Sequence, residues 1–284
     1  MAGGTGNQNI RDVGRDRRQR RALRRLARRA AVVGAVRYNQ SMPLQLFRAT
    51  VCRILDLTHD VRELDLRLVE PAAIAFKAGQ FVSFDVGRNE KQQALIRPYS
   101  IASPPSSTGV LTLLFNLVPG GPGSTYLFSL KEGAETRFKG PAGSFRLRDD
   151  PARDHLFVAT GTGIAPIRSM LLALFEKDAA CGVTLFWGLR SRRDLYYQDE
   201  LAAWAKAHPR FTFTTTLSRP EEGWSGERGR VTRLVEERVA SVNNLAVYLC
   251  GNSGMLDDVT TLIQKKGLCP IYREKYYDDT GEPE

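Results

Sequence analysis

Two short strings in this 284-residue chain carry the residue types needed to hold phosphate-bearing ligands. In Arg97-Pro98-Tyr99-Ser100, the guanidinium offers a fixed fork of donors to a diphosphate, and the next side chains offer a flat ring and a hydroxyl. In Gly-Thr-Gly-Ile-Ala-Pro, at residues 161–166, glycines allow close approach of the backbone to a ligand, and the proline suits the first turn of a helix. Together the two strings predict a pair of nucleotide sites, an arrangement suited to hydride transfer.

Each string has a companion farther along the chain. Gly123, Ser124 and Thr125 place flexible backbone and two hydroxyls at a predicted helix start, where backbone N–H groups favour an anion. Cys250-Gly251-Asn252-Ser253-Gly254-Met255 ends an apolar run and leads into another predicted helix. Taken singly, several of these residues have simpler structural interpretations: a surface ion pair for Arg97, a core ring for Tyr99, a tight turn for residues 161–163 and a small buried side chain for Cys250.

Residues 44–148 are predicted to form a small antiparallel β-barrel. Residues 63–68 alternate strictly between polar and apolar side chains, which is typical of a half-buried strand. Further runs rich in β-branched and aromatic residues, separated by Gly and Pro turns, occupy residues 47–55, 81–86 and 110–118. Several short strands without a long helix favour such a barrel.

Residues 152–270 are predicted to form an α/β domain with a parallel sheet. Apolar strands alternate with amphipathic helical stripes: strands at residues 155–159, 183–187, 211–217 and 245–250, and stripes at residues 167–175, 231–239 and 255–263. A sheet of this kind binds its ligand at the carboxyl ends of the strands. Because Gly161 and Cys250 both stand at strand ends, we expect both at that edge.

The charge of the chain is concentrated near its start. The formal net charge is +10, and residues 1–40 hold 11 arginines and two acidic residues. The other 244 residues hold 30 basic and 29 acidic side chains, so the expected folded part is nearly neutral. We expect residues 1–41 to form a flexible Arg-rich arm, and a translation start at Met42 is a further hypothesis. A basic amphipathic helix that contacts a membrane surface, a nucleic acid or an acidic protein is the alternative.

The chain lacks the residue spacings of a metal site. Its four cysteines, at positions 52, 181, 250 and 269, match neither zinc nor iron–sulfur patterns, and its three histidines are equally scattered. We therefore expect no metal, and reduced thiols in a cytoplasmic protein. No apolar run is long enough to span a bilayer.

These strings together resemble the ferredoxin–NADP⁺ reductase superfamily of FAD-binding flavoproteins. The matching pieces are Ala78-Gly79-Gln80-Phe81-Val82, residues 97–104, residues 121–127 and Gly140-Pro141-Ala142-Gly143-Ser144-Phe145. The resemblance implies an FAD site formed by Arg97, Pro98, Tyr99, Ser100, Gly123, Ser124 and Thr125. It implies a coenzyme site with Gly161, Thr162, Gly163 and Pro166 at the NAD(P) pyrophosphate, and Gly251, Asn252 and Met255 beyond it.

The choice of coenzyme depends on the strand end near residue 217. A 2′-phosphate needs cationic side chains and a hydroxyl, whereas an NADH site usually places an acid on the ribose. Ser218, Arg219, Arg228 and Arg230 meet the first requirement, and NADP-dependent members of the superfamily have a Ser-Arg or Thr-Arg pair here. We expect NADP(H), with NAD(H) as the alternative.

The resemblance also suggests which residues surround the reacting rings. Ser100 would lie near the flavin, and Cys250 near the nicotinamide, where it would shape the site and not act as a nucleophile. Glu274 and Tyr276 match the Glu-x-Tyr terminus of plant-type reductases, and oxygenase reductases have a similar Glu-Lys-Phe string. Residues 271–284 would then form a tail near the flavin and nicotinamide. The alternative is a final strand whose aromatic side chains pack on the second domain.

The resemblance implies a reductase that transfers hydride between NADP(H) and FAD and exchanges single electrons with a separate ferredoxin or flavodoxin. One alternative is an NADH-dependent reductase component of an oxygenase, or a flavin reductase. Another, from a different class, is a protein that acts on nucleic acid or a membrane surface through the basic arm. Ferredoxins and flavodoxins are usually acidic, so a basic surface would attract them. We expect no nucleic-acid partner and no transmembrane segment.

Overall fold

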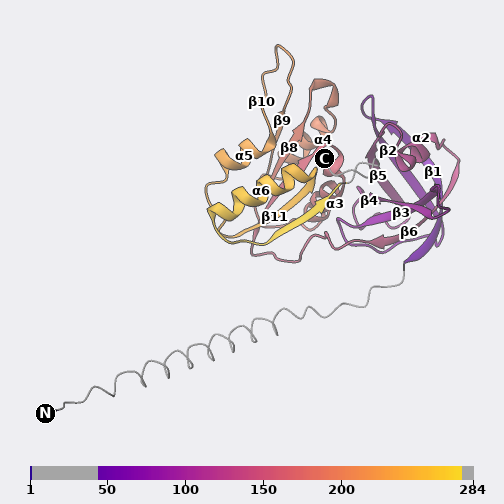
Figure 1. Cartoon of the computed structure of the whole chain (residues 1–284), viewed down its shortest axis with the longest axis horizontal. Coiled ribbons are helices and arrows are strands. Elements are labelled where there is room, and N and C mark those ends of the chain that lie inside the picture. The colour runs from indigo at the N-terminus through magenta and orange to yellow at the C-terminus, as the bar shows by residue number, and fades with distance from the viewer. Residues whose placement is uncertain (2–43, 277–284) are drawn as a thin grey trace. The chain divides into compact units, whose positions relative to one another are not determined.

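The computed structural model describes Met1 and residues 44–276. Residues 2–41 of the expected arm, the possible start at Met42 and residues 277–284 of the expected tail lie outside the described residues. Residues 44–276 form an antiparallel barrel followed by an α/β domain (Figure 1). The predicted fold class is therefore confirmed.

The barrel consists of six antiparallel strands and one short helix. They are β1 (Gln45–Asp56), β2 (Val61–Glu70), β3 (Phe81–Arg88), β4 (Ala94–Ser100), β5 (Val110–Asn116), α2 (Pro122–Ser129) and β6 (Glu135–Ala142). The strand order is β4-β3-β6-β1-β2-β5, and an isolated bridge between Ile101 and Leu113 joins the two outer strands. Inside, the rings of Phe47 and Phe138 stack with centroids 5.3 Å apart. Phe84 of the same core packs edge-on against Tyr99 of β4, with centroids 5.9 Å apart, and so holds the Arg-Pro-Tyr-Ser string in place.

The α/β domain contains a six-stranded sheet in the order β10-β9-β8-β7-β11-β12, parallel throughout. Its strands are β7 (Asp154–Thr160), β8 (Val183–Leu189), β9 (Phe211–Leu217), β10 (Glu227–Arg228), β11 (Leu245–Gly251) and β12 (Ile271–Lys275). Its helices are α3 (Ile164–Glu176), α4 (Gln198–Ala207), α5 (Val231–Arg238) and α6 (Ser253–Lys266), and two single 3-10 turns are η1 (Gly161–Gly163) and η2 (Arg192–Asp194).

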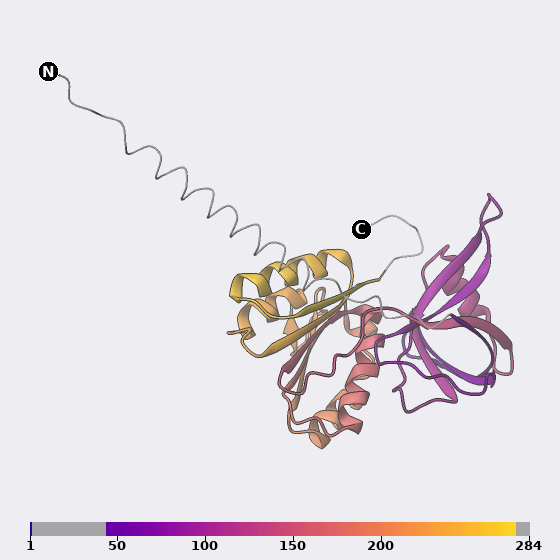
Figure 2. The ribbon, with the colours of Figure 1, turned by 90° about the horizontal axis from the view of Figure 1, so that it is seen from below.

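The sheet is covered by helices on both faces (Figure 2). Because successive side chains of a strand point to opposite faces, Phe157 and Ala159 of β7 pack in the cluster that contains α3 and α4. Leu156 and Val158 pack in the cluster that contains α5 and α6. Because both faces of the sheet are buried, a ligand can reach its strands only at their ends.

The barrel and the α/β domain belong to one compact unit and share buried polar contacts. In α3, the Ser169 hydroxyl donates to the Ser103 carbonyl at 2.7 Å, and Arg168 Nη1 donates to the Ala102 carbonyl at 3.1 Å. Both acceptors directly follow β4. These bonds tie the first helix of the α/β domain to the strand that carries the Arg-Pro-Tyr-Ser string.

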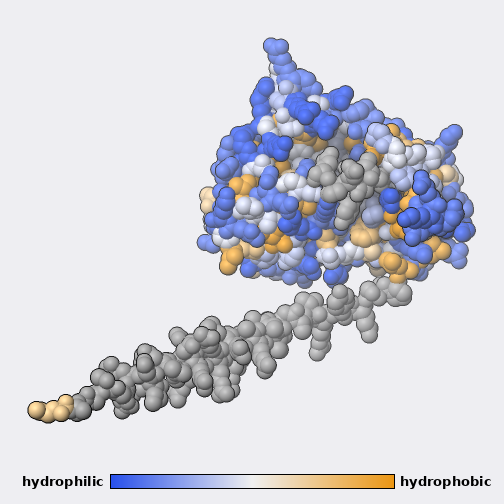
Figure 3. All heavy atoms as spheres, in the orientation of Figure 1, coloured by the Kyte–Doolittle hydropathy of each residue, from blue (hydrophilic) through white to orange (hydrophobic). Residues whose placement is uncertain are grey.

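The surface drawn in Figure 3 is mainly hydrophilic, with hydrophobic residues in small scattered areas. The large hydrophobic side chains exposed within residues 44–276 are Leu44, Leu46, Leu55, Val69, Ile96 and Leu268. None of the described helices combines the length and the apolar character needed to cross a membrane.

Candidate functional site

The two strings expected to bind FAD meet in the barrel. A Cβ atom on Gly123, in the first turn of α2, would lie 2.5 Å from the Tyr99 hydroxyl oxygen and 2.8 Å from Arg97 Cγ. Glycine is therefore required for α2 to approach β4. The Tyr99 ring is held edge-on by Phe84 and Phe115, with centroids 5.9 and 5.5 Å away. One face of the barrel thus offers a guanidinium, an aromatic ring and a helix start together.

Ser124, in the first turn of α2, connects the helix to the loop that precedes it. Only 2% of this residue is exposed, and its hydroxyl accepts from the Val118 N–H at 3.0 Å. The same hydroxyl lies 3.3 Å from the Gly121 carbonyl oxygen. Thr125 is exposed on the first turn, and its N–H donates to the same carbonyl at 3.0 Å. These bonds shape a helix start that can receive a negative charge.

The carboxyl ends of the parallel strands form one row along the sheet. In the order β10, β9, β8, β7, β11 and β12, the residues at these ends are Arg228, Ser218, Arg190, Gly161, Gly251 and Lys275, and Glu274 directly precedes Lys275. At a strand spacing of about 4.8 Å, the row extends over roughly 24 Å. The arginines lie at the β10 end of the row, which we call its cationic end. The predicted reaction site lies at the β12 end.

Two glycine turns pack against each other in the middle of this row. A Cβ on Gly163 would lie 2.3 Å from the Cys250 carbonyl oxygen, and one on Gly251 would lie 2.1 Å from Thr160 Oγ1. Gly251 also has a φ of +150°, which favours glycine. Thr160 Oγ1 accepts from the Asn252 N–H at 3.2 Å and so joins the two turns. Sequence patterns did not single out this threonine, although it directly precedes residues 161–166, the glycine string.

Several residues predicted to bind the coenzyme hold the turns in shape. The Asn252 side chain caps α6 by accepting from the Met255 N–H at 2.8 Å, and the Met255 side chain is buried in the core. Pro166 is buried in the first turn of α3. The Thr162 hydroxyl donates to Asn116 Oδ1 of β5 at 3.0 Å. The glycine string is thereby anchored to the barrel.

The cationic end of the row gathers the residues predicted to select the coenzyme. Ser218, Arg219, Arg228 and Arg230 are all exposed there. The Arg219 N–H donates to the Arg190 carbonyl at 2.7 Å, so Arg190, which sequence patterns did not single out, joins this group. Its position directly after β8 is the signal that would have found it. The carboxylate of Glu221 accepts from the Arg192 N–H, and this bond lowers the pKa of Glu221.

The four residues predicted to surround the reacting rings come together at the other end. The Ser100 hydroxyl, from the barrel, donates to Glu274 Oε2 at 3.4 Å, and Cys250 pairs with Glu274 across β11 and β12. Burial raises the pKa of Glu274 to about 7 and that of the Cys250 thiol well above its usual value. The Tyr276 N–H donates to the Gly251 carbonyl at 3.0 Å, and burial raises the pKa of its hydroxyl, a shift that a hydrogen bond with Ser100 opposes in part.

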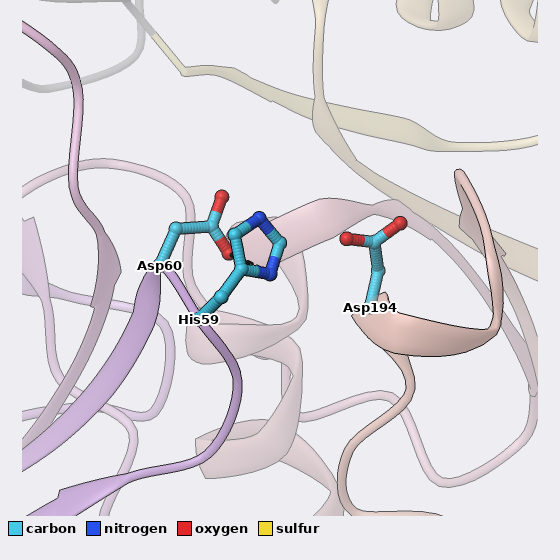
Figure 4. Close-up of side chains that lie close together, drawn as sticks. All are labelled: His59, Asp60 and Asp194. Carbon is cyan, nitrogen blue, oxygen red and sulfur yellow. Dashed lines mark ion pairs between the residues drawn. The ribbon is translucent and has the colours of Figure 1, made fainter.

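A separate cluster of possible metal ligands lies between the β1–β2 turn and η2. Ligand atoms of His59, Asp60 and Asp194 lie within 4.8 Å of one another (Figure 4). One oxygen of Asp194 already accepts from the N–H and hydroxyl of Ser191, and one oxygen of Asp60 accepts from the Thr58 hydroxyl. His59 Nδ1 also lies 3.6 Å from Asp60 Oδ1, and Arg193 Nε lies 4.0 Å from the second oxygen of Asp194, so neighbouring protein groups account for the cluster and we assign no metal to it.

Comparisons with known proteins agree with this geometry. The oxidoreductase FAD-binding domain family matches residues 48–147, and the oxidoreductase NAD-binding domain family matches residues 157–261. A relative from Sorangium cellulosum (strain So ce56), ferredoxin--NADP reductase B, is 36% identical over 228 residues, which cover 77% of this chain and 90% of the relative. The chain belongs to the ferredoxin–NADP⁺ reductase superfamily. As a member, it is an oxidoreductase with FAD and NAD(P)(H) as cofactors.

Other members of this superfamily are reductase components of oxygenases. The ferredoxin--NAD(P)(+) reductase component of a Ralstonia sp naphthalene 1,2-dioxygenase/salicylate 5-hydroxylase system is 30% identical, over 83% of this chain and 70% of the relative. The crystal structure of the Amycolatopsis cytochrome P450 reductase GcoB has a TM-score of 0.74 at 29% identity, over 83% of this chain and 71% of that one.

The residues present fit both cofactors. Gly123 lets the first turn of α2 approach Arg97 and Tyr99 closely, and a helix start beside a guanidinium suits a diphosphate. At the carboxyl ends of the strands, nothing lies within 4 Å of the position that a Cβ would take on Gly161, so a coenzyme phosphate can approach the backbone there.

Proposed function

We propose that this chain is an NADP(H)-dependent reductase that exchanges single electrons with a separate ferredoxin or flavodoxin. The observation that carries the proposal is the row of strand ends that runs from Arg228 to Lys275, where Glu274 meets Ser100 of the barrel. The arginines and the glycine string would hold the phosphates of a dinucleotide, and Cys250 would line the site of its nicotinamide. Bound FAD supplies a ring that accepts hydride and releases electrons one at a time.

Each group of residues has its own part in the proposed reaction. Arg97 would donate to the FAD diphosphate, and the ring of Tyr99 would pack on the cofactor. Cys250 stays a neutral thiol, since burial raises its pKa, and it therefore shapes the site and does not attack a ring. Glu274, whose pKa is about 7, can hold or release a proton at the Ser100 hydroxyl near neutral pH.

We propose NADP(H) over NAD(H) because four exposed residues at the cationic end suit a 2′-phosphate. Anaerobic titration of the FAD-loaded protein with NADPH and with NADH, followed by flavin absorbance, tests both the function and the preference. Arg219→Ala should weaken NADPH binding at least about tenfold and leave NADH binding unchanged, because a hydrogen bond to a charged group is lost. Arg67→Ala, which changes an exposed arginine of β2, is the matched control. A flavin that neither nucleotide reduces would contradict the proposal.

The electron acceptor is the second part of the proposal. A ferredoxin or flavodoxin is the first choice, and an oxygenase component is the second, because relatives from Ralstonia sp and from Pseudomonas sp. (strain CF600) are named as reductase components of such systems. We also propose that the 11 arginines of residues 1–40 attract the acidic acceptor in the cytoplasm, where the four unpaired cysteines would stay reduced. Deleting residues 1–40 should then reduce the salt dependence of acceptor reduction, and an unchanged salt dependence would contradict this role.

A further inference from the structure

The carbonyl oxygen of Gly161 is held by two buried side chains. Trp187 Nε1 donates to it at 3.0 Å, and the Tyr196 hydroxyl donates to it at 3.1 Å. Trp187, on β8, is fully buried, and Tyr196, between η2 and α4, is 5% exposed. Their rings pack edge to face with centroids 4.8 Å apart. The Ile164 N–H, which ends the 3-10 turn, points to the same oxygen.

This arrangement sets the direction of the next backbone N–H. In a planar trans peptide, a carbonyl and the N–H that follows it point in opposite directions. The bond between Gly161 and Thr162 is trans, because the cis bonds of the described chain are those before Pro71 and Pro141. The Thr162 N–H therefore points away from Trp187 and Tyr196.

The turn needs this support. Gly161 has a φ of +51°, a conformation that glycine reaches easily but leaves just as easily. Nothing lies within 4 Å of the position a Cβ would take there, so no packing against that side of the residue restrains it. The two side-chain hydrogen bonds to the carbonyl supply the restraint.

We infer that Trp187 and Tyr196 are positioning residues for the pyrophosphate of NAD(P)(H). By holding the Gly161 carbonyl, they aim the Thr162 N–H at the bound anion. The inference deepens the proposed function and rests on it. Neither side chain needs to touch the coenzyme. Burial raises the pKa of Tyr196 well above its usual value, so its hydroxyl remains a donor throughout the neutral range.

The next residue provides a matched control. Tyr197 has a φ of +56°, and its side chain takes a different direction from that of Tyr196. Its hydroxyl donates to the Glu63 carboxylate of β2, and the Arg168 guanidinium lies 5.0 Å from its ring centroid. Tyr196→Phe and Tyr197→Phe thus remove the same atom from adjacent residues and break bonds to different partners.

The test measures dissociation constants for NADP⁺ and for 2′-AMP with the full-length, FAD-loaded protein. NADP⁺ contains the pyrophosphate and 2′-AMP lacks it, although both carry the 2′-phosphate. We expect Tyr196→Phe to weaken NADP⁺ binding by roughly 2- to 10-fold, the effect of one lost hydrogen bond, and to leave 2′-AMP binding unchanged. Trp187→Phe should weaken NADP⁺ binding in the same way. Tyr197→Phe should leave both affinities unchanged, and flavin content verifies that each variant is folded.

Three results would overturn the inference. The first is an unchanged NADP⁺ affinity in Tyr196→Phe. The second is an equal loss of affinity for 2′-AMP, because that would reflect a general loosening of the domain. The third is an equal loss of NADP⁺ affinity in Tyr197→Phe. If the wild-type protein binds neither nucleotide, the proposed function itself fails, and this outcome is separate from the other three.

Discussion

Replacing Glu274 by glutamine should change how the stability of the protein depends on pH. Burial raises the pKa of this carboxyl to about 7 from a standard value of 4.5, and the bond from Ser100 opposes the shift only in part. The folded protein therefore binds a proton at this site more tightly than the unfolded chain does. The difference between about 7 and 4.5 corresponds to about 3 kcal/mol, at about 1.36 kcal/mol per pKa unit.

The sign of the effect follows from the raised pKa. The protonated carboxyl contributes its full stability below pH 4.5, and this contribution is lost as the pH rises through about 7. Glutamine is neutral at every pH and escapes this loss. Glu274→Gln should therefore match the wild type near pH 4 and be more stable by up to about 3 kcal/mol near pH 8.

Urea unfolding of the FAD-loaded proteins across this pH range measures the difference in the free energy of unfolding. Glu236→Gln is the control, because it makes the same chemical change at an exposed position of α5. It should show no pH-dependent difference from the wild type. If the difference in the free energy of unfolding between Glu274→Gln and the wild type stays constant from pH 4 to 8, the reasoning is refuted. Burial of the Glu274 charge would then not be the cause of that difference.

Three further substitutions test the packing of the site and core. Gly163→Ala should lower the free energy of unfolding by about 1–3 kcal/mol and weaken NADP⁺ binding, because the new Cβ would lie 2.3 Å from the Cys250 carbonyl oxygen. In the same NADP⁺ titrations, Gly254→Ala, with its nearest neighbouring atom 3.5 Å away, should behave like the wild type. Gly123→Ala should reduce the FAD retained after gel filtration, since its Cβ would lie 2.5 Å from a tyrosine hydroxyl oxygen, and full retention would contradict the proposed FAD site. Phe138→Ala should lower the free energy of unfolding by about 3–5 kcal/mol in urea titrations, and a loss far below this would argue against a packed barrel core.

Hydrophobic periodicity alone predicted most elements of both domains. The strands expected at residues 63–68 and 155–159 lie within β2 and β7, and the stripe at residues 255–263 lies within α6. The strand β6 was missed because it has few apolar residues and ends near Pro141. The helix α4 was missed because Leu201 is the only residue it buries, so it has no continuous apolar stripe.

The Arg-Pro-Tyr-Ser string itself lies in a strand, β4, that sequence patterns did not predict through to Ser100. Pro98 removes a backbone donor, which argues against a strand interior. It is accommodated because β4 lies at the end of the hydrogen-bonded strand order, where one side of the strand has no regular ladder to complete. The position of a strand within its sheet is a tertiary property.

Local patterns were enough to predict the two-domain fold, and the two predicted nucleotide sites follow from glycines, arginines and strand ends, which carry the local chemistry of phosphate binding. Which of these residues meet depends on packing between distant segments. Ser100 and Glu274 are 174 residues apart in the chain, and their contact, with the raised pKa of Glu274, exists because the two domains bury that carboxyl together. The bonds from Trp187 and Tyr196 to Gly161 likewise depend on side-chain directions that only packing sets. Local patterns do not encode such directions, since burial and contact arise between segments far apart in the sequence.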